Sequence, residues 1–427
     1  MSTPPTSEAA VGASPCFVFA GGGTGGHLMP ALAIIERLRE LRPDVRVLVL
    51  CADREIDRRI LGPSGVDFCP IDAQPPALRP FPAAPLRFAR AFTRSRVQAA
   101  RAIEAFRGPC RGGETNPRGV GPSGADSCIV VAMGGFVSGP AAWAARFSVS
   151  VPRPPVVLVN LDRIPGRANR FVARLARHVI TALDVVDAPA VFHRAEVVGL
   201  PIRRRALATE AADTCRRHFG LYPDRPTLLV TGASQGAQSL NRLMIALTET
   251  TEALDAMAGW QVLHLAGDAK TEDREALVTA YRIADLPARV IGFCEEMGMA
   301  WGAADLALSR AGASSVAEAA ANCVPTVFAP YPWHIDRHQE RNAEPLVARG
   351  GAWMTTDHVD PQRNLEGLGR LLVTAMGDPE TLRRAAIALR ELPRRDAAET
   401  VARRLIAWSE GSAAAADVAG GSFVATS

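Results

Sequence analysis

The chain of 427 residues is long enough for two domains, each with its own buried core. Its composition, 48% hydrophobic and 22% charged, is that of a globular protein. A formal net charge of +4 is too small to favour nucleic acid as the main partner.

The eight cysteines are scattered and form no C-x-x-C pair, which favours a reducing compartment over a disulfide framework. No apolar run approaches the roughly 20 residues that a membrane span requires. Residues 1–15 lack the basic and apolar regions of a signal peptide, and we expect them to be a disordered tail. The small and polar residues 411–427 predict a second disordered tail.

Short apolar runs alternate with helical segments in the first half of the chain. The runs lie at 17–20, 45–52, 128–135 and 155–161, with a helix expected at 29–41. Strands that are apolar throughout are typical of a parallel sheet covered on both faces. Residues 108–127 are rich in Gly, Pro and Ser without periodicity and predict an irregular surface insertion. We expect this first domain to span 16–202.

A second series of strands begins after Pro201. Its apolar runs lie at 226–232, 260–267, 289–294, 305–312 and 325–332. Two successive sets of alternating strands and helices predict an α/β protein with two doubly wound, Rossmann-like domains that face a cleft. We expect the second domain to span 203–385.

Glycine-rich turns follow three of the predicted strands, at 21–26, 133–140 and 232–236. Such a turn, followed by a helix, aims backbone N–H groups at one point, and the helix dipole adds about half a positive charge there. Glycine is needed because a Cβ atom would keep an oxyanion or a sugar away from the backbone. Three turns at the carboxyl ends of predicted strands favour a ligand cleft over simple tight bends.

The first turn also matches a dinucleotide fingerprint, Gly21-x-Gly23-x-x-Gly26. Asp53 follows the second strand, roughly where an acid would bind an adenine ribose. However, the turn carries extra glycines and ends in His27, and a hydride enzyme has no evident use for a second glycine turn in its other half. An NAD-type oxidoreductase therefore ranks as the weaker alternative.

Taken together, these segments resemble the MurG family, glycosyltransferase family 28, from about residue 17 to 405. The resemblance is carried, in the family's order and approximate spacing, by GGGTGGHLMPALAI, MGGFVSGPAAWAA, VVGLPIR, TGASQGAQSLN, SRAGASSVAEAAA and DRHQERNA. Enzymes of this family transfer N-acetylglucosamine (GlcNAc) from UDP-GlcNAc to the MurNAc hydroxyl of lipid I, which forms lipid II in peptidoglycan biosynthesis. The resemblance implies the GT-B fold, with the donor held mainly by the C-terminal domain. It also implies that a helix at 386–410, within the helical stretch 379–410, crosses back to the first domain.

The resemblance also implies site residues. Arg203 would add a fixed positive charge as the diphosphate leaves, and Glu318 would accept hydrogen bonds from the ribose hydroxyls. Cys294 marks the backbone that meets the uracil edge. The diphosphate would meet Ser234, Gln235 and Gly236, and the GlcNAc hydroxyls would meet His338 and Gln339. The other implied substrate positions are Thr24, Gly25, Gly26, Asp162, Asn169, Ala313, Ser314, Ser315, Val316 and Ala317, with Gly134, Gly135 and Ser138 in an acceptor loop.

Simpler interpretations of three of these residues remain open from the sequence. Glu318 fits a solvated position on a helix that begins near residue 314. Arg203 is followed by Arg204 and Arg205, so any of the three fits a surface charge at a domain linker. His27 fits a residue that caps its own helix.

The chain contains no Asp-x-Asp and no His/Cys cluster with metal-ligand spacing, so no metal or cofactor is expected. Arginine, backbone N–H groups and helix dipoles would then stabilise the leaving UDP, in agreement with the metal-independent, inverting chemistry usual for this fold. A base would remove the proton of the acceptor hydroxyl, a contribution of about 10²–10⁴-fold. His27 is the first candidate for this base and Asp162 is the second.

Two segments depart from the family pattern. After PVVL the family usually has His-Glu-x-Asn, whereas this chain has Val159-Asn160-Leu161-Asp162, and the family's Gln-Gln is His338-Gln339 here. UDP-sugar binding is therefore better supported than lipid I as the acceptor. The alternatives are a different glycolipid or small-molecule acceptor, or a non-catalytic UDP-sugar-binding relative that scaffolds cell-wall enzymes.

A lipid acceptor implies a peripheral location at the cytoplasmic face of the inner membrane, with the anionic membrane surface and other cell-wall enzymes as partners. Residues 83–107 form a basic amphipathic pattern, with a membrane patch expected at Arg87, Phe88, Arg90, Phe92 and Arg94. The same pattern fits a crossover helix that packs on the sheet and has a solvated basic edge. The sequence leaves both interpretations open.

Overall fold

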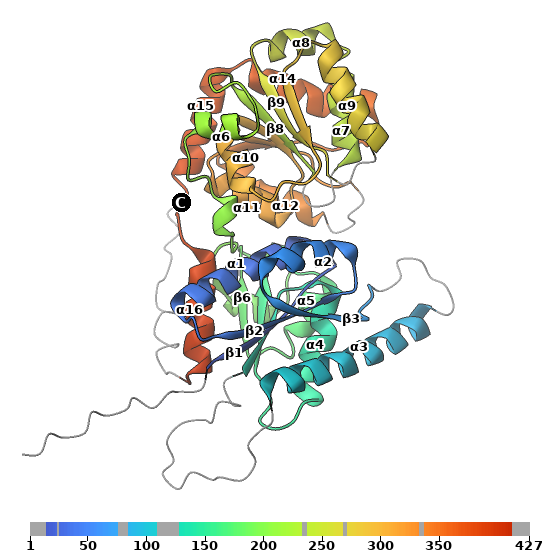
Figure 1. Ribbon diagram of the computed structural model, residues 1–427, viewed down its shortest axis with the longest axis vertical. Coiled ribbons are helices and arrows are strands. Elements are labelled where there is room, and N and C mark those ends of the chain that lie inside the picture. The colour runs from blue at the N-terminus through green and yellow to red at the C-terminus, as the bar shows by residue number, and fades with distance from the viewer. Residues whose placement is uncertain are drawn as a thin grey trace, which may run out of the picture.

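The structure, a computed structural model, describes residues 14–23, 25–75, 84–108, 128–232, 237–267, 271–332 and 337–411. Two separate parallel sheets, each covered by helices, form two α/β domains that face each other (Figure 1). The predicted fold class is therefore confirmed. Most of the expected insertion and of both tails, together with Thr24, Ser234, Gln235 and Gly236, lies outside the described residues.

The first sheet has the strand order β3-β2-β1-β4-β5-β6-β7. Its strands are β1 (Cys16–Ala20), β2 (Arg46–Ala52), β3 (Asp67–Ile71), β4 (Cys128–Ala132), β5 (Val156–Asn160), β6 (His178–Thr181) and β7 (Glu196–Val197). Successive side chains of a strand point to opposite faces of the sheet. Phe17 and Phe19 accordingly enter the core on one face, and Val18 and Ala20 enter the core on the other. This burial on both faces explains why the strands are apolar throughout.

The helices of the first domain are α1 (Gly25–Leu41), α2 (Glu55–Leu61), α3 (Ala84–Arg107), α4 (Gly135–Phe147) and α5 (Arg167–Val172). Helix α1 begins at Gly25, four residues before the predicted start, so the glycine turn passes directly into the helix. Short 3-10 turns lie at Gly62–Ser64, Ala190–Arg194 and Arg204–Ala206. The carboxyl ends of β1 and β4 and the amino-terminal ends of α1 and α4 thus lie at one edge of the sheet.

The second sheet has the order β10-β9-β8-β11-β12-β13. Its strands are β8 (Thr227–Thr231), β9 (Gln261–Leu265), β10 (Ala288–Ile291), β11 (Leu306–Ser309), β12 (Thr326–Phe328) and β13 (Ala352–Met354). The helices around it are α6 (Ala212–His218), α7 (Gln238–Leu247), α8 (Thr251–Met257), α9 (Thr271–Ile283), α10 (Met297–Ala303), α11 (Ala313–Ala321), α12 (His338–Ala348), α13 (Pro361–Asn364) and α14 (Arg370–Met376), with a π-helical turn at Leu365–Gly369.

The helix expected at 386–410 to cross back to the first domain begins later than expected, because the structure has two helices within 379–410. These are α15 (Pro379–Arg390) and α16 (Ala397–Ser409). Pro393 lies in the break between them, because proline has no N–H to donate to a helical hydrogen bond and its ring clashes with the preceding turn of a helix. Helix α16 packs beside α1 of the first domain, with Val401 and Leu405 in the same core as Leu38 (Figure 1). The chain therefore passes between the domains twice, once before Arg204 and once before α16.

Candidate active site

His27 lies where two glycine turns of the first domain meet. It stands in the first turn of α1, and its ring packs against the turn between β4 and α4. A Cβ atom at Gly134 would lie 2.9 Å from His27 Cδ2, and one at Gly135 would lie 3.2 Å from His27 Nδ1. Both glycines also have positive φ, 105° and 74°, which other residues rarely adopt. The second turn is therefore glycine-rich because the imidazole lies directly on its backbone.

Asp57 holds the first glycine turn in place, a role that the sequence analysis missed. Its carboxylate accepts hydrogen bonds from Gly23 N at 2.9 Å and Ala52 N at 2.9 Å. The Gly23 amide is thus already used inside the protein, which argues against a pyrophosphate at that amide. Asp53, the acid of the dinucleotide interpretation, pairs with Arg58 on the surface.

The electrostatic surroundings of His27 favour the neutral imidazole. Burial lowers the pKa of His27 below its ordinary value, and Asp162 opposes this shift more than Asp57 does. The charge of a protonated His338 would lower the pKa of His27 further. A neutral imidazole at pH 7 can accept a proton, as a general base requires. The structure therefore brings His27, Asp162 and His338 into one electrostatic neighbourhood, although they come from different elements and from both domains.

The loop after β5 is tied to the second domain. Asp162 Oδ1 accepts a hydrogen bond from Asn342 Nδ2 on α12 at 3.0 Å, and Arg163 N donates to Asn342 Oδ1 at 3.2 Å. Arg163 also pairs with Glu344 at 3.2 Å. The altered segment 159–162 is thus part of an interdomain contact.

Asn169 and Ser138 support this edge of the first domain from inside. Asn169 Nδ2 donates to Asn160 Oδ1 at 2.8 Å, and Asn160 in turn donates to the carbonyl of Asp162 at 2.7 Å. Ser138 Oγ accepts from Gly134 N at 2.9 Å and donates to the Ala20 carbonyl at 2.8 Å. Both side chains are buried and fix the loops that surround His27.

Glu318 lies in a small cavity where the linker between the domains meets α11. The cavity has a volume of about 60 Å³, and its lining includes Met29, Arg203, Cys294, Ser314 and Glu318. Trp301 Nε1 donates to Glu318 Oε2 at 2.9 Å, and burial raises the pKa of Glu318 to about 7. Ser314 Oγ is buried and, within the described residues, has no hydrogen-bond partner. Glu318 is therefore not a solvated surface residue.

A larger cleft of about 760 Å³ adjoins this cavity at Phe293 and Glu295. It lies between α2 of the first domain and the carboxyl ends of β9 and β10 of the second. Arg59 from α2 stacks over Phe293 with 4.5 Å between the guanidinium carbon and the ring centre. The two domains thus face each other across a cleft, and the candidate uracil position, Cys294, lines the small cavity that adjoins it.

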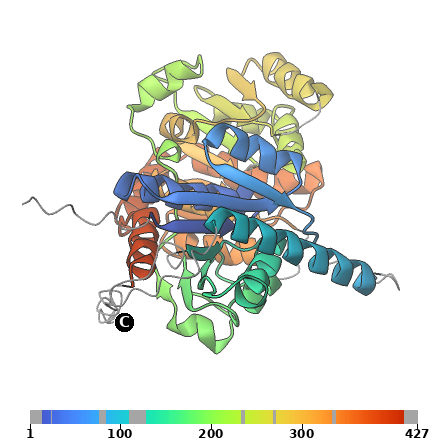
Figure 2. The same cartoon turned by 60° about the horizontal axis from the view of Figure 1, so that its bottom comes forward.

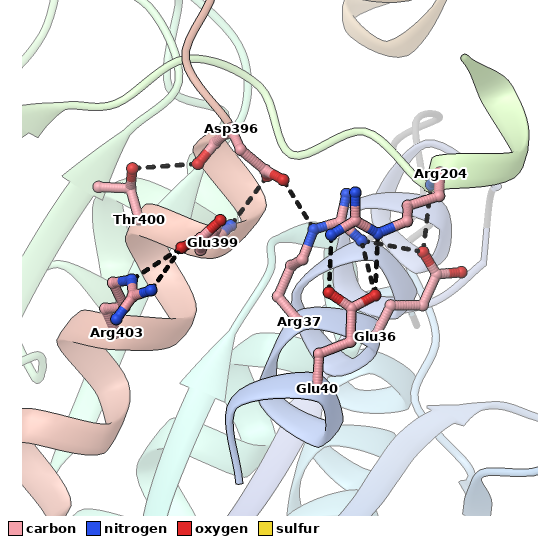
Figure 3. Close-up of polar contacts among 8 residues, drawn as sticks. All are labelled: Glu36, Arg37, Glu40, Arg204, Asp396, Glu399, Thr400 and Arg403. Carbon is pink, nitrogen blue, oxygen red and sulfur yellow. Dashed lines mark hydrogen bonds and ion pairs between the residues drawn. The ribbon is translucent and has the colours of Figure 1, made fainter. Parts of the chain in front are cut away.

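Arg203 is anchored to the first domain. Its Nε donates to Glu36 Oε1 of α1 at 2.7 Å, and its side chain is 12% exposed. Its Nη1 is buried and has no hydrogen-bond partner among the described residues. Arg204 instead pairs on the surface with Glu40 at 2.8 Å (Figure 3). Of these two arginines, Arg203 is the buried one that lines the Glu318 cavity.

The remaining candidates begin two helices of the second domain. Ala313, Ser314, Ser315, Val316 and Ala317 form the start of α11, and His338 and Gln339 form the start of α12. Gln339 Oε1 accepts from Tyr331 N at 2.8 Å. These helix starts point their orphan N–H groups toward the carboxyl edge of the second sheet.

A buried ion pair that the sequence analysis missed lies at the start of α7. Arg310 Nη1 lies 2.7 Å from Asp357 Oδ2, and both groups bond Ser239 in the first turn of α7. Burial opposes ionisation of Asp357, but hydrogen bonds from Ser239 and Asn364 and the charge of Arg310 hold its pKa below the ordinary value. Helix α7 is therefore fixed at the end that follows residues 233–236, which lie outside the described residues.

Within the described ranges, no three His, Cys, Asp or Glu side chains gather where they could hold a metal ion. No helix of the same ranges is long and apolar enough to cross a bilayer.

Two parallel-sheet domains that face each other across a cleft are the architecture of the GT-B class of glycosyltransferases. The profile of the glycosyltransferase family 28 N-terminal domain matches residues 17–108, and that of the family 28 C-terminal domain matches residues 227–401. A UDP-N-acetylglucosamine–N-acetylmuramyl-(pentapeptide) pyrophosphoryl-undecaprenol N-acetylglucosamine transferase of Clavibacter sepedonicus is 36% identical over 391 residues, 90% of this chain and 94% of that one. The enzyme with the same description from Nocardioides sp. is 36% identical over 405 residues, 93% of this chain and 99% of that one. The chain belongs to glycosyltransferase family 28.

Solved structures agree with this assignment. The crystal structure of Acinetobacter baumannii MurG is similar with a TM-score of 0.63 and 25% identity, and the match covers 92% of this chain and 99% of that one. The calicheamicin glycosyltransferase CalG4 shares the fold, with a TM-score of 0.56 and 16% identity over 92% of this chain and 98% of that one.

Proposed function

We propose that this glycosyltransferase transfers GlcNAc from UDP-GlcNAc to the MurNAc hydroxyl of lipid I and so forms lipid II in peptidoglycan biosynthesis. The observation that carries the proposal is the near full-length similarity to enzymes described by this reaction, together with His27 between two glycine turns of the first domain. Radiolabelled GlcNAc transfer from UDP-GlcNAc to lipid I, with and without EDTA, tests it. Loss of transfer in EDTA would refute the metal-independent mechanism, and absence of transfer under both conditions would refute the activity.

The donor is proposed to bind across the Glu318 cavity and the adjoining cleft. In this proposal, Glu318 accepts hydrogen bonds from the ribose hydroxyls, and the backbone at Cys294 meets the uracil edge. The cavity of about 60 Å³ holds only a few water molecules, whereas ligand pockets typically measure about 300–1,000 Å³. The adjoining cleft of about 760 Å³ supplies the volume that the rest of the donor needs.

The chemical step is proposed to be a single displacement with inversion. His27 takes the proton of the acceptor hydroxyl, whose oxygen forms the new bond to the anomeric carbon while the bond from that carbon to the UDP oxygen breaks. Arg203 and the N–H groups at the starts of α7 and α11 stabilise the negative charge that develops on the diphosphate. Asp162 stabilises the imidazolium that forms, because its carboxylate raises the pKa of His27.

A different acceptor is the second candidate, and the loop after β5 supports it. Its residues 160–163 bond Asn169 and α12 instead of presenting the family's His-Glu pair. Parallel transfer assays with lipid I, other undecaprenyl glycolipids and small sugar acceptors separate the two candidates. Donor hydrolysis without transfer to any of these acceptors would exclude both.

We also propose that α3 attaches the protein to an anionic membrane surface, such as the cytoplasmic face of the inner membrane. The carboxyl-terminal half of α3 is a crossover helix, because Ala99 and Ile103 are buried on the sheet. The amino-terminal half extends beyond the domain (Figure 2), with Arg87, Phe88 and Arg90 exposed. Its aromatic side chains continue onto α4 and α5 in a cluster of Phe88, Phe92, Trp143, Phe147 and Phe171. Basic and aromatic side chains together are typical of an interfacial helix.

A further inference from the structure

Two cysteines lie side by side at the amino-terminal ends of the central strands of the first sheet. Cys16 begins β1, and Cys128, which begins β4, is its direct partner in the parallel register. Their Sγ atoms are 2.8 Å apart, and each residue is 2% exposed. This separation is shorter than the roughly 3.5–4.0 Å of ordinary contacts between nonbonded atoms. The two thiols are therefore in direct contact and are joined by a hydrogen bond.

The backbone around the pair suits a disulfide bond. Neighbouring strands lie about 4.8 Å apart, which is within the roughly 4.4–6.8 Å between Cα atoms that a disulfide spans. Both side chains enter the same core on one face of the sheet. A bond between them therefore needs rotation of the side chains but no displacement of the strands.

The two thiols differ in their electrostatic surroundings. The hydrogen bond with Cys128 lowers the pKa of Cys16, burial opposes this, and the charges of Arg46 and Arg107 lower the pKa further. The same hydrogen bond raises the pKa of Cys128 well above its ordinary value. Burial raises the pKa of Cys51 to about 12. Cys16 is thus the thiol of the pair that supplies the nucleophilic thiolate.

We propose that Cys16 and Cys128 form a redox-active dithiol that is oxidised by low-molecular-weight disulfides. When local opening at the ends of β1 and β4 exposes it, the Cys16 thiolate attacks one sulfur of the small disulfide and releases the other sulfur as a thiolate, which leaves a mixed disulfide on Cys16. Cys128 loses its proton to the released thiolate and attacks the Cys16 sulfur, which expels the second small thiolate. Two protein thiols are oxidised to one disulfide, and one small disulfide is reduced to two thiols.

This site is separate from the candidate active site. Cys16 is at the opposite end of β1 from Gly21, and a strand of this length spans about 16 Å at roughly 3.3 Å per residue. The cross-link joins positions 112 residues apart, so it restricts the unfolded chain strongly. Oxidation is therefore expected to raise the melting temperature by several degrees and to leave GlcNAc transfer within about twofold.

The test uses the full-length protein treated with hydroxyethyl disulfide, followed by mass mapping of unreduced peptides. The variants are Cys16→Ala and Cys128→Ala, with Cys51→Ala as a matched control that is equally buried in β2. We expect a Cys16–Cys128 cross-link in the wild type and in the control but in neither variant. Cys128→Ala should instead retain the mixed disulfide on Cys16.

Two results would overturn the proposal: no such cross-link in the native protein, or a cross-link that forms only in denaturant. The cross-link and the melting temperature are read without any substrate. An enzyme inactive toward lipid I would therefore leave this test unaffected.

Discussion

Asn342 offers the sharpest test of how the two domains cooperate, through the substitution Asn342→Asp. The side chain is 1% exposed, its Nδ2 donates to Asp162 Oδ1 at 3.0 Å, and its Oδ1 accepts from Arg163 N at 3.2 Å. Aspartate has the same shape but no donor. The variant would therefore place two carboxylate oxygens against each other where a hydrogen bond now joins the domains.

A hydrogen bond to a charged group contributes about 1.5–3 kcal/mol, which corresponds to about a 10- to 150-fold change in an equilibrium. The domain arrangement described here would become less populated by that factor. Because α12 also carries His338 and Gln339, we expect the affinity for UDP-GlcNAc to fall by up to the same factor. A proton shared by the two carboxylates relieves their repulsion, so the defect should shrink as the pH falls from 8 toward 5.

Calorimetric titration of UDP-GlcNAc across this pH range measures the effect. The double variant Asp162→Asn/Asn342→Asp again places an amide opposite a carboxylate and should recover affinity. Because Asp162 is also a candidate base, the recovery is read in binding and not in kcat. Gln362→Glu, on the exposed side of α13, makes the same charge change as a control. If Asn342→Asp binds UDP-GlcNAc at pH 8 within twofold of the wild-type affinity, this contact does not hold the two domains together.

Three further predictions concern the base, the ribose site and the membrane surface. His27→Gln should lower kcat for GlcNAc transfer by about 10²–10⁴-fold, and wild-type kcat should fall at acid pH as His27 becomes protonated; unchanged kcat in the variant would exclude His27 as the base. Burial raises the pKa of Glu318 from 4.5 to about 7, so the folded state binds this proton more tightly than the unfolded chain does. The contribution of Glu318 to the free energy of unfolding therefore decreases as the pH rises from 4.5 through 7. Glu318→Gln should therefore stabilise the protein at pH 8 by about 1–3 kcal/mol in thermal unfolding while weakening UDP binding, and a variant that binds UDP normally would argue for a purely structural role. Arg87, Arg90 and Arg94 together changed to Glu should weaken co-sedimentation with anionic liposomes, whereas the same change at Arg383, Arg384 and Arg390 on α15 should not; equal sedimentation of both triple variants would contradict the membrane proposal.

The fold could be predicted from the sequence because its strands are buried on both faces. Val18 and Phe19 must both be apolar, since they enter cores on opposite sides of one sheet. Helix ends were harder to place. The start of α1 lies inside the glycine turn, where no apolar periodicity marks it, and the break before α16 depends on Pro393 within a pattern that is otherwise helical.

Site residues could be predicted where they stand in a sequence motif. Residues that depend on a partner far away in the sequence could not. His27 and Glu318 stand in recognisable segments, and the structure places one between two glycine turns and the other in a cavity. Asp57 lies 34 residues from the Gly23 amide that it binds, and Asn342 lies 180 residues from Asp162. Neither pairing leaves a periodic or local signal, because only the tertiary fold brings the partners together.

Charged side chains near the end of α1 bind both segments in which the chain crosses between the domains. Arg37 is 1% exposed, and its Nε lies 2.7 Å from Asp396 at the second crossing of the chain, while Glu40 holds Arg204 at the first crossing (Figure 3). Helix α16 also shares a core with α1. We therefore expect an opening motion to separate α12 from the loop after β5 while α1 keeps its contacts with both crossings. Arg203 is bonded to Glu36 on the same helix, so we expect its charge to keep its place beside the Glu318 cavity while the cleft opens.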